Sequence, residues 1–264
     1  MKGSPSLPNI PEGTVEPMVR DDQYAEALKK VQSEIGCLQW IALRSRPDIA
    51  ATVGSAACMS TVHPGLVSKL CQGIWRYLSA TRNHGVLFCS LPDGPHLDDT
   101  LWCYGDASLA PGASRSRTGV IILWGDHLIS WKSQRQALTA WSAFEAEVDA
   151  SATTCQTLKI LLEQVVSAPV RMVLGSDNAA CVVNCVKGSS STVPTRTRHF
   201  GMRCAYIRDQ ARREGRYIRD QAKREGFEIE HVAGTQIPAD ALTKVLPRCR
   251  LEDSGQKLKV LAAE

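Results

Sequence analysis

The stretch Leu101–Ala110, LWCYGDASLA, decides the fold class because it has the pattern of a β-strand that ends on a carboxylate. Leu101, Cys103 and Gly105 alternate with larger side chains up to Asp106, and small residues then interrupt the run. An aspartate at the end of a strand is, taken alone, usually a turn or helix-cap residue. Its meaning therefore depends on whether further carboxylates occupy comparable places in the chain.

Composition places the chain among ordinary globular proteins. Of its 264 residues, 44% are hydrophobic and 22% are charged, which permits one large domain or two small ones. The net charge of +4 is compatible with a polyanionic partner without requiring one. Ten cysteines without a CxxC pair indicate reduced, buried thiols. With neither a secretory signal pattern nor an apolar run of membrane-spanning length, we expect an intracellular protein without a membrane partner.

The pattern along the chain divides it into two structured parts. Helical periodicity begins at Asp21, and Pro47 and Pro64 are placed to open two further helices before a short strand at Gly85–Cys89. A stretch with two prolines and three aspartates then separates this part from a mixed α/β part. We predict a disordered lead-in at 1–20, a helical segment at 21–90, a linker at 91–99, an α/β domain at 100–246 and a flexible tail at 247–264.

The second part has the element order of an α/β domain. Two closely spaced strands after the first predict an antiparallel meander, and a long helix with one apolar face follows. We expect a five-stranded mixed sheet flanked by helices. Its predicted strands are 101–106, 118–124, 127–133, 170–176 and 227–232, and its predicted helices are 142–166, 178–187, 194–225 and 238–246.

An internal duplication lies in the basic helix predicted at 194–225. Tyr206–Arg216, YIRDQARREGR, is followed directly by Tyr217–Phe227, YIRDQAKREGF, with nine of eleven positions identical. Eleven residues are close to three α-helical turns, so the duplication keeps Ile207 and Ile218 on one face. It is too short for a repeat array.

Four carboxylates stand at comparable element ends: Asp106 and Asp177 end strands, whereas Glu145 and Asp240 begin helices. Converging carboxylates repel one another, and divalent metal ions are the usual solution. Oxygen ligands favour Mg²⁺ or Mn²⁺, and two such ions suit a phosphoryl displacement. Helix geometry does not choose Glu145 over Glu147, which flank the apolar stripe on opposite sides.

An ordered series of motifs resembles copia-type LTR-retrotransposon polyproteins over about residues 22–246. The motifs that resemble the ribonuclease H domain of these polyproteins are YGDAS, RSRTGV, LISWKSQRQ, FEAEV, GSDNAA, TRTRHF and IPADALTK. Upstream, IGCLQWIALRSRPDIAATV and IWRYLSATRNHGVLF resemble the end of the reverse transcriptase, its thumb or connection.

The resemblance implies a ribonuclease H-like domain that hydrolyses the RNA strand of an RNA–DNA hybrid with two Mg²⁺ or Mn²⁺ ions. It implies Asp106, Glu145, Asp177 and Asp240 as catalytic metal ligands, and its TEAEY pattern selects Glu145. Basic residues expected to contact the hybrid are Lys132, Arg135, Arg196 and Arg198, together with His199. The resemblance further implies the reverse-transcriptase palm and fingers, absent from this chain, as a partner. We expect an intracellular location, either cytoplasmic, for example in virus-like particles, or nuclear.

Several departures from the pattern favour a diverged copy. The polymerase motif YxDD is absent, so no polymerase activity is expected from this chain. Ala143-Phe144 replaces a pair of threonines, and Leu109 stands where the resemblance has tryptophan. The alternative is therefore a catalytically inactive nucleic-acid-binding remnant of a degenerate retroelement. A third hypothesis is a structural subunit of a polymerase assembly.

Overall fold

A computed structural model describes most of the chain, and its elements form two compact units. The first comprises Met1–Leu87, Lys132–Gln134 and Lys244–Glu264, and the second comprises Phe88–Trp131 and Arg135–Thr243. Described are residues 6–11, 16–88, 100–109, 115–164, 171–187, 201–211, 228–245, 253, 256, 258 and 260–262.

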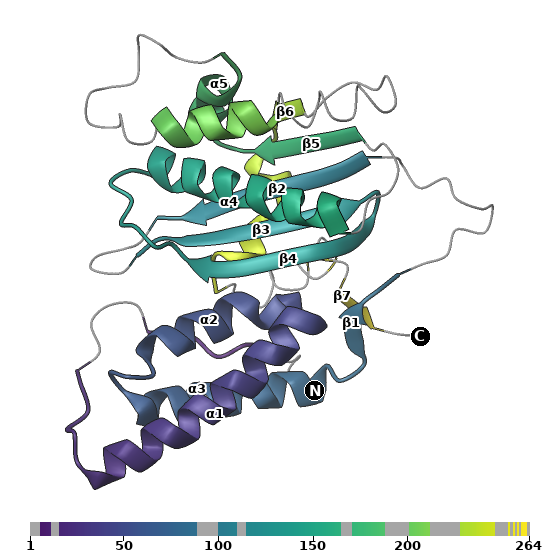
Figure 1. The fold of residues 1–264 in the computed structure, drawn as a ribbon. Coiled ribbons are helices and arrows are strands. Elements are labelled where there is room, and N and C mark those ends of the chain that lie inside the picture. Colours follow the sequence, from purple (N-terminus) through teal and green to yellow (C-terminus); the bar gives the residue numbers. More distant parts are fainter. Residues whose placement is uncertain are drawn as a thin grey trace. The chain divides into compact units, whose positions relative to one another are not determined.

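The first unit is helical, as its periodicity predicts (Figure 1). Asp21 caps the first helix by accepting a 2.8 Å hydrogen bond from the Tyr24 N–H group. Pro47 and Pro64 begin the following helices, where a proline loses no helical hydrogen bond. Its elements are α1 (Asp22–Arg44), η1 (Pro47–Ile49), α2 (Ala50–Met59), α3 (Pro64–Ala80), β1 (His84–Val86) and β7 (Val260–Ala262).

A buried ion pair joins η1 to α3 in this unit. The Arg46 guanidinium donates two hydrogen bonds to Asp48, at 2.9 and 2.7 Å, and both residues are 4% exposed. Tyr77 donates its hydroxyl to Asp48 at 2.8 Å, and Thr81 accepts from Arg46 through its carbonyl and its hydroxyl. Because every charge has several partners, the pair fixes the loop after α1 despite its desolvation.

Parts of the segments predicted as lead-in and tail are described and make contacts within the first unit. In the lead-in, Leu7 is buried, and the Met18 N–H group donates to the Val62 carbonyl at 2.9 Å. In the tail, Val260–Ala262 forms β7, which pairs antiparallel with β1. Leu258 and Val260 are buried, so burial of apolar side chains stabilises a segment whose short pattern gave little signal.

The second unit contains the predicted five-stranded mixed sheet flanked by helices, which is confirmed. The strand order is β4-β3-β2-β5-β6. β2 pairs antiparallel with β3 and parallel with β5, and β5 pairs parallel with β6. The strands are β2 (Thr100–Ser108), β3 (Arg117–Trp124), β4 (His127–Arg135), β5 (Arg171–Ser176) and β6 (Glu228–His231).

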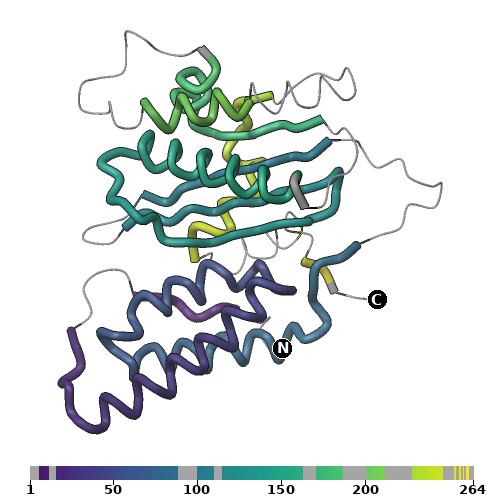
Figure 2. Tube along the Cα trace, viewed as in Figure 1, coloured from purple at the N-terminus to yellow at the C-terminus, as the bar shows by residue number. Residues whose placement is uncertain are grey.

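Helical segments cover both faces of this sheet (Figures 1 and 2). α4 (Ala143–Gln164) lies across one face, where Gly105 of β2 allows close approach: a Cβ there would lie 2.7 Å from Thr154 Oγ1. The 3₁₀ helix η4 (Pro238–Leu242) packs over Gly119 of β3, where a Cβ would lie 2.7 Å from the Ala239 carbonyl oxygen. Gly119 is paired with Asp106, whose side chain lies on the face opposite to that of Gly105.

α5 (Ala179–Lys187) and a helix at 201–211 complete the α4 side of the core. Arg203 of the latter helix forms an ion pair with Asp149 of α4. The rest of the basic helix predicted at 194–225, with most of the duplication, lies outside the described residues. The eight described cysteines are all free thiols, and six of them are buried. Among the described residues, no helix has both the length and the apolar character needed to span a membrane.

Candidate metal centre

Asp106 lies inside β2, the central strand of the sheet, and not in a turn. The strand continues to Ser108, and Asp106 is 5% exposed. One of its carboxylate oxygens, Oδ2, accepts a hydrogen bond from the Thr243 hydroxyl at 2.5 Å. The interpretation of Asp106 as an exposed turn or cap residue therefore does not apply.

Asp177 follows the last residue of β5, the strand paired in parallel with β2. The side chain of Asn178 caps α5 by accepting from the Cys181 N–H group at 2.9 Å, so capping does not account for Asp177. The carbonyl oxygen of Asp177 lies 3.1 Å from Nε2 of His231. A Cβ on Gly234 would lie 3.0 Å from Oδ2 of Asp177. Asp177 is exposed, at the solvent side of the group.

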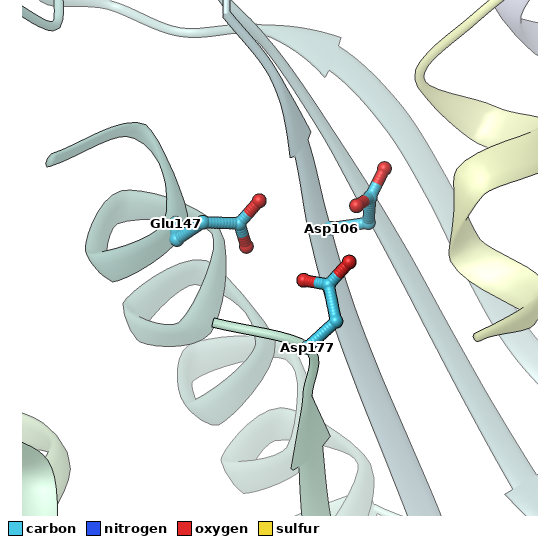
Figure 3. A group of neighbouring side chains, drawn as sticks. All are labelled: Asp106, Glu147 and Asp177. Atoms are coloured by element: carbon cyan, nitrogen blue, oxygen red, sulfur yellow. The ribbon is translucent and has the colours of Figure 1, made fainter. Parts of the chain in front are cut away.

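Glu147 lies on α4 and points toward both aspartates (Figure 3). Its Oε1 accepts a hydrogen bond from the Ala107 N–H group at 3.2 Å, which ties α4 to β2 directly beside Asp106. Its other oxygen, Oε2, is buried and accepts no hydrogen bond within the described part of the chain. Burial, together with the charges of Asp106 and Asp177, raises the pKa of Glu147 to about 9.

The three carboxylates form one group. Asp106, Glu147 and Asp177 each place an oxygen within 4.8 Å of the others (Figure 3). Among the described residues, the buried Glu147 Oε2 has no hydrogen-bond partner, and it lies beside two further carboxylates. A divalent ion would satisfy that oxygen, and an all-oxygen ligand set suits Mg²⁺ or Mn²⁺. The residues present therefore fit a divalent metal site.

Glu145, which the resemblance implies as the helix-borne ligand, does not lie in this group of converging carboxylates. Its Oε2 accepts a 2.6 Å hydrogen bond from the Trp141 N–H group, and its own N–H group donates to Ser142 Oγ at 3.2 Å. This closely resembles a capping box, in which a serine and a glutamate three residues later cap the helix start. The sequence Ser142-Ala143-Phe144-Glu145 contains that signal, which would have left Glu147 as the ligand.

Asp240 lies in the first turn of η4, on the face of the sheet that carries the Asp106 side chain. Its carbonyl oxygen accepts from Thr243 Oγ1 at 3.1 Å, and its side chain is half-buried. Its carboxylate is not among the three that converge within 4.8 Å. The structure thus places Asp240 in the element beside Asp106 without bringing it into the cluster.

The basic residues predicted to contact nucleic acid are only partly described. Lys132 lies on β4 and is half-buried, and Arg135 ends that strand and is exposed. Arg196, Arg198 and His199 lie outside the described residues.

Comparison with known proteins connects this architecture to mobile elements. The chain is 27% identical over 232 residues to the retrovirus-related Pol polyprotein from transposon RE1 of Arabidopsis thaliana, covering 86% of this chain. It is 28% identical over 232 residues to that from transposon TNT 1-94 of Nicotiana tabacum, covering 83% of this chain.

The chain is a homologue of copia-type retrotransposon Pol polyproteins. This confirms the resemblance seen in the motifs. The chain spans 14% and 15% of the length of these two relatives. No protein-family model matches it.

Among solved structures, the RNase H1 of Halobacterium salinarum NRC-1 aligns with 54% of this chain and 93% of its own chain, at a TM-score of 0.40 and 15% identity. LC11-RNase H1 in complex with an RNA/DNA hybrid aligns with 54% of this chain and 92% of its own, at a TM-score of 0.38 and 16% identity.

Proposed function

We propose that this Pol homologue is a ribonuclease H that hydrolyses the RNA strand of RNA–DNA hybrids. The observation that carries the proposal is the convergence of Asp106, Glu147 and Asp177 at one point of a mixed sheet. Two of these acids come from neighbouring parallel strands, whose carboxyl ends share one edge of the sheet. The homology to Pol polyproteins supports a role in copying a retrotransposon.

Two divalent ions, Mg²⁺ or Mn²⁺, would be held by these carboxylates, with Asp240 as a further candidate ligand. When bound, such ions supply Lewis-acid chemistry that activates water and stabilises the leaving oxygen of a phosphodiester. The residues have different tasks in holding them. Glu147 offers its unpaired Oε2 while Ala107 holds its Oε1. Asp106 is rigid and buried, whereas Asp177 stands at the exposed side from which a phosphate backbone could approach.

The substrate is a hybrid duplex recognised through its backbone. Shape and 2′-hydroxyl groups distinguish such a duplex from DNA, and contacts to phosphates are independent of sequence. The net charge of +4 suits a polyanion. We assign phosphate contacts to Lys132, Arg135, Arg196, Arg198 and His199. The first unit is proposed as the thumb or connection of the reverse transcriptase, whose palm and fingers would be partners of this intracellular protein.

A non-catalytic, hybrid-binding remnant is the second candidate, favoured by the eleven-residue duplication at 206–227. A cleavage assay separates the two. The full chain is incubated with a hybrid labelled on the RNA strand and Mg²⁺, beside an Asp177→Asn variant. Asp177 suits this test because it is exposed, so its replacement leaves packing intact.

We expect wild type to release RNA fragments with 3′-hydroxyl ends, while duplex RNA and duplex DNA stay intact and the variant is inactive. Binding of the hybrid without cleavage by wild type would favour the remnant. Equal cleavage by wild type and variant would refute the assigned site.

A further inference from the structure

Thr243 is not one of the three converging acids, but its hydroxyl contacts one of them, Asp106. Its hydroxyl lies 2.5 Å from Asp106 Oδ2 and 3.1 Å from the Asp240 carbonyl oxygen, and the side chain is 5% exposed. A hydroxyl has one proton to donate. The contact to the carboxylate oxygen, at 2.5 Å, is shorter than the contact to the carbonyl oxygen, at 3.1 Å, and is the stronger of the two. The proton is therefore directed at Asp106.

The backbone of β3 places Thr243 at this position. Gly119 is paired with Asp106 across the β2–β3 ladder. A Cβ at Gly119 would lie 2.7 Å from the Ala239 carbonyl oxygen, 2.9 Å from Thr243 Cγ2 and 3.0 Å from Leu242 Cβ. Only a glycine leaves room for η4 to rest on the strand at this point. The two segments, 124 residues apart in sequence, thus build one support for the Asp106 carboxylate.

We propose that Thr243 is a positioning residue that orients the Asp106 carboxylate for metal binding. An aspartate carboxylate can rotate about its last side-chain bond, and a metal ligand must be held to within about 0.5 Å. Anchoring Oδ2 through the Thr243 hydroxyl restricts that rotation in a carboxylate that has an oxygen within 4.8 Å of oxygens of Glu147 and Asp177. Partners of this kind, one step behind a ligand, typically contribute about 10- to 100-fold in metal affinity or activity.

A purely structural role is the competing explanation. Threonine at the end of a short helix often donates its hydroxyl to a carbonyl three or four residues earlier, as the contact with Asp240 illustrates. In that case the hydroxyl stabilises the end of η4, and loss of it changes folding stability without changing metal affinity. The two explanations therefore differ in the quantity that responds.

The test measures Mn²⁺ binding to the full chain by electron paramagnetic resonance. Thr243→Val removes the hydroxyl and keeps the shape, and Thr243→Ser keeps the hydroxyl. Thr157→Val is the matched control, because Thr157 donates to the Thr153 carbonyl at 2.9 Å and contacts none of the three acids. If Thr243→Val fails to fold, Thr243→Cys replaces it, since a thiol of similar size is a much weaker donor.

We expect the Mn²⁺ dissociation constant to rise about tenfold or more in Thr243→Val, to return to within about twofold in Thr243→Ser and to be unchanged in Thr157→Val. Unchanged affinity in folded Thr243→Val or Thr243→Cys would overturn the proposal. The inference rests on one part of the proposed function, namely that the three acids bind a divalent metal ion. Wild type that binds Mn²⁺ without cleaving hybrid would refute ribonuclease activity and still leave Thr243 tested.

Discussion

Glu147→Gln should stabilise the metal-free protein at neutral pH, although it replaces a buried residue of the proposed centre. The pKa of Glu147 is raised from 4.5 to about 9, so between these values the folded state binds a proton that the unfolded state has lost. The stability that this protonated group contributes is complete below pH 4.5 and is lost as the pH rises toward 9. At pH 7.5, three pH units above the unfolded value, the loss is on the order of 4 kcal/mol. Glutamine has the same shape as glutamate and is neutral at every pH, so Glu147→Gln does not suffer this loss of stability.

Urea unfolding in EDTA, followed by circular dichroism from pH 5 to 8, measures this effect. We expect the free energy of unfolding of wild type to fall with pH more steeply than that of Glu147→Gln, which should become the more stable protein by pH 7.5. Glu145→Gln is the control, because its side chain binds the Trp141 N–H group and not the acid cluster. Parallel pH profiles for wild type and Glu147→Gln would refute the assigned burial and charge repulsion.

Three further predictions concern the packing and the metal. Arg46→Leu leaves Asp48 buried without its cation and should lower the free energy of unfolding, measured with urea, by about 3–5 kcal/mol. Arg171→Leu removes an exposed ion pair with Glu228, and in the same assay it should lower the free energy of unfolding by less than about 1 kcal/mol. Gly105→Ala pushes α4 away from β2 and should lower the melting temperature, unlike alanine at Gly85, where the space is open. Mg²⁺ at 100 times its dissociation constant should stabilise the chain by about 2.7 kcal/mol for each ion bound, and EDTA should reverse this in calorimetry.

Much of the second unit was predictable because its strands carry strong local signals. The alternation in LWCYGDASLA and the short turn at Gly125-Asp126 predicted β2, β3 and β4 with ends within two residues of those observed. Gly125 takes a positive φ of 53°, which glycine adopts without strain. The local pattern also predicted Asp106 in the first strand of the sheet and Asp177 directly after the fourth, and the structure places both in the group of three acids.

Three features were not predicted from the sequence: the place of Glu147 in the acid cluster, the contact of Thr243 with Asp106, and β7. The resemblance selected Glu145, whereas the structure places Glu145 in a capping arrangement with Ser142 and Glu147 in the acid cluster. The contact of Thr243 with Asp106 joins residues 137 positions apart, and no periodicity predicts such a pair. β7 is similar, because three residues pair with β1 and gain stability only through that distant partner.

Hybrid cleavage by Glu147→Gln and Glu145→Gln, measured side by side at saturating Mg²⁺, tests the central claim most directly. The account assigns the buried, unpaired Oε2 of Glu147 to the metal and the side chain of Glu145 to the start of α4. It predicts that Glu147→Gln lowers the cleavage rate by at least about 100-fold, while Glu145→Gln stays within about threefold of wild type because glutamine also serves in a capping box. Loss of cleavage in Glu145→Gln with activity retained in Glu147→Gln would contradict it.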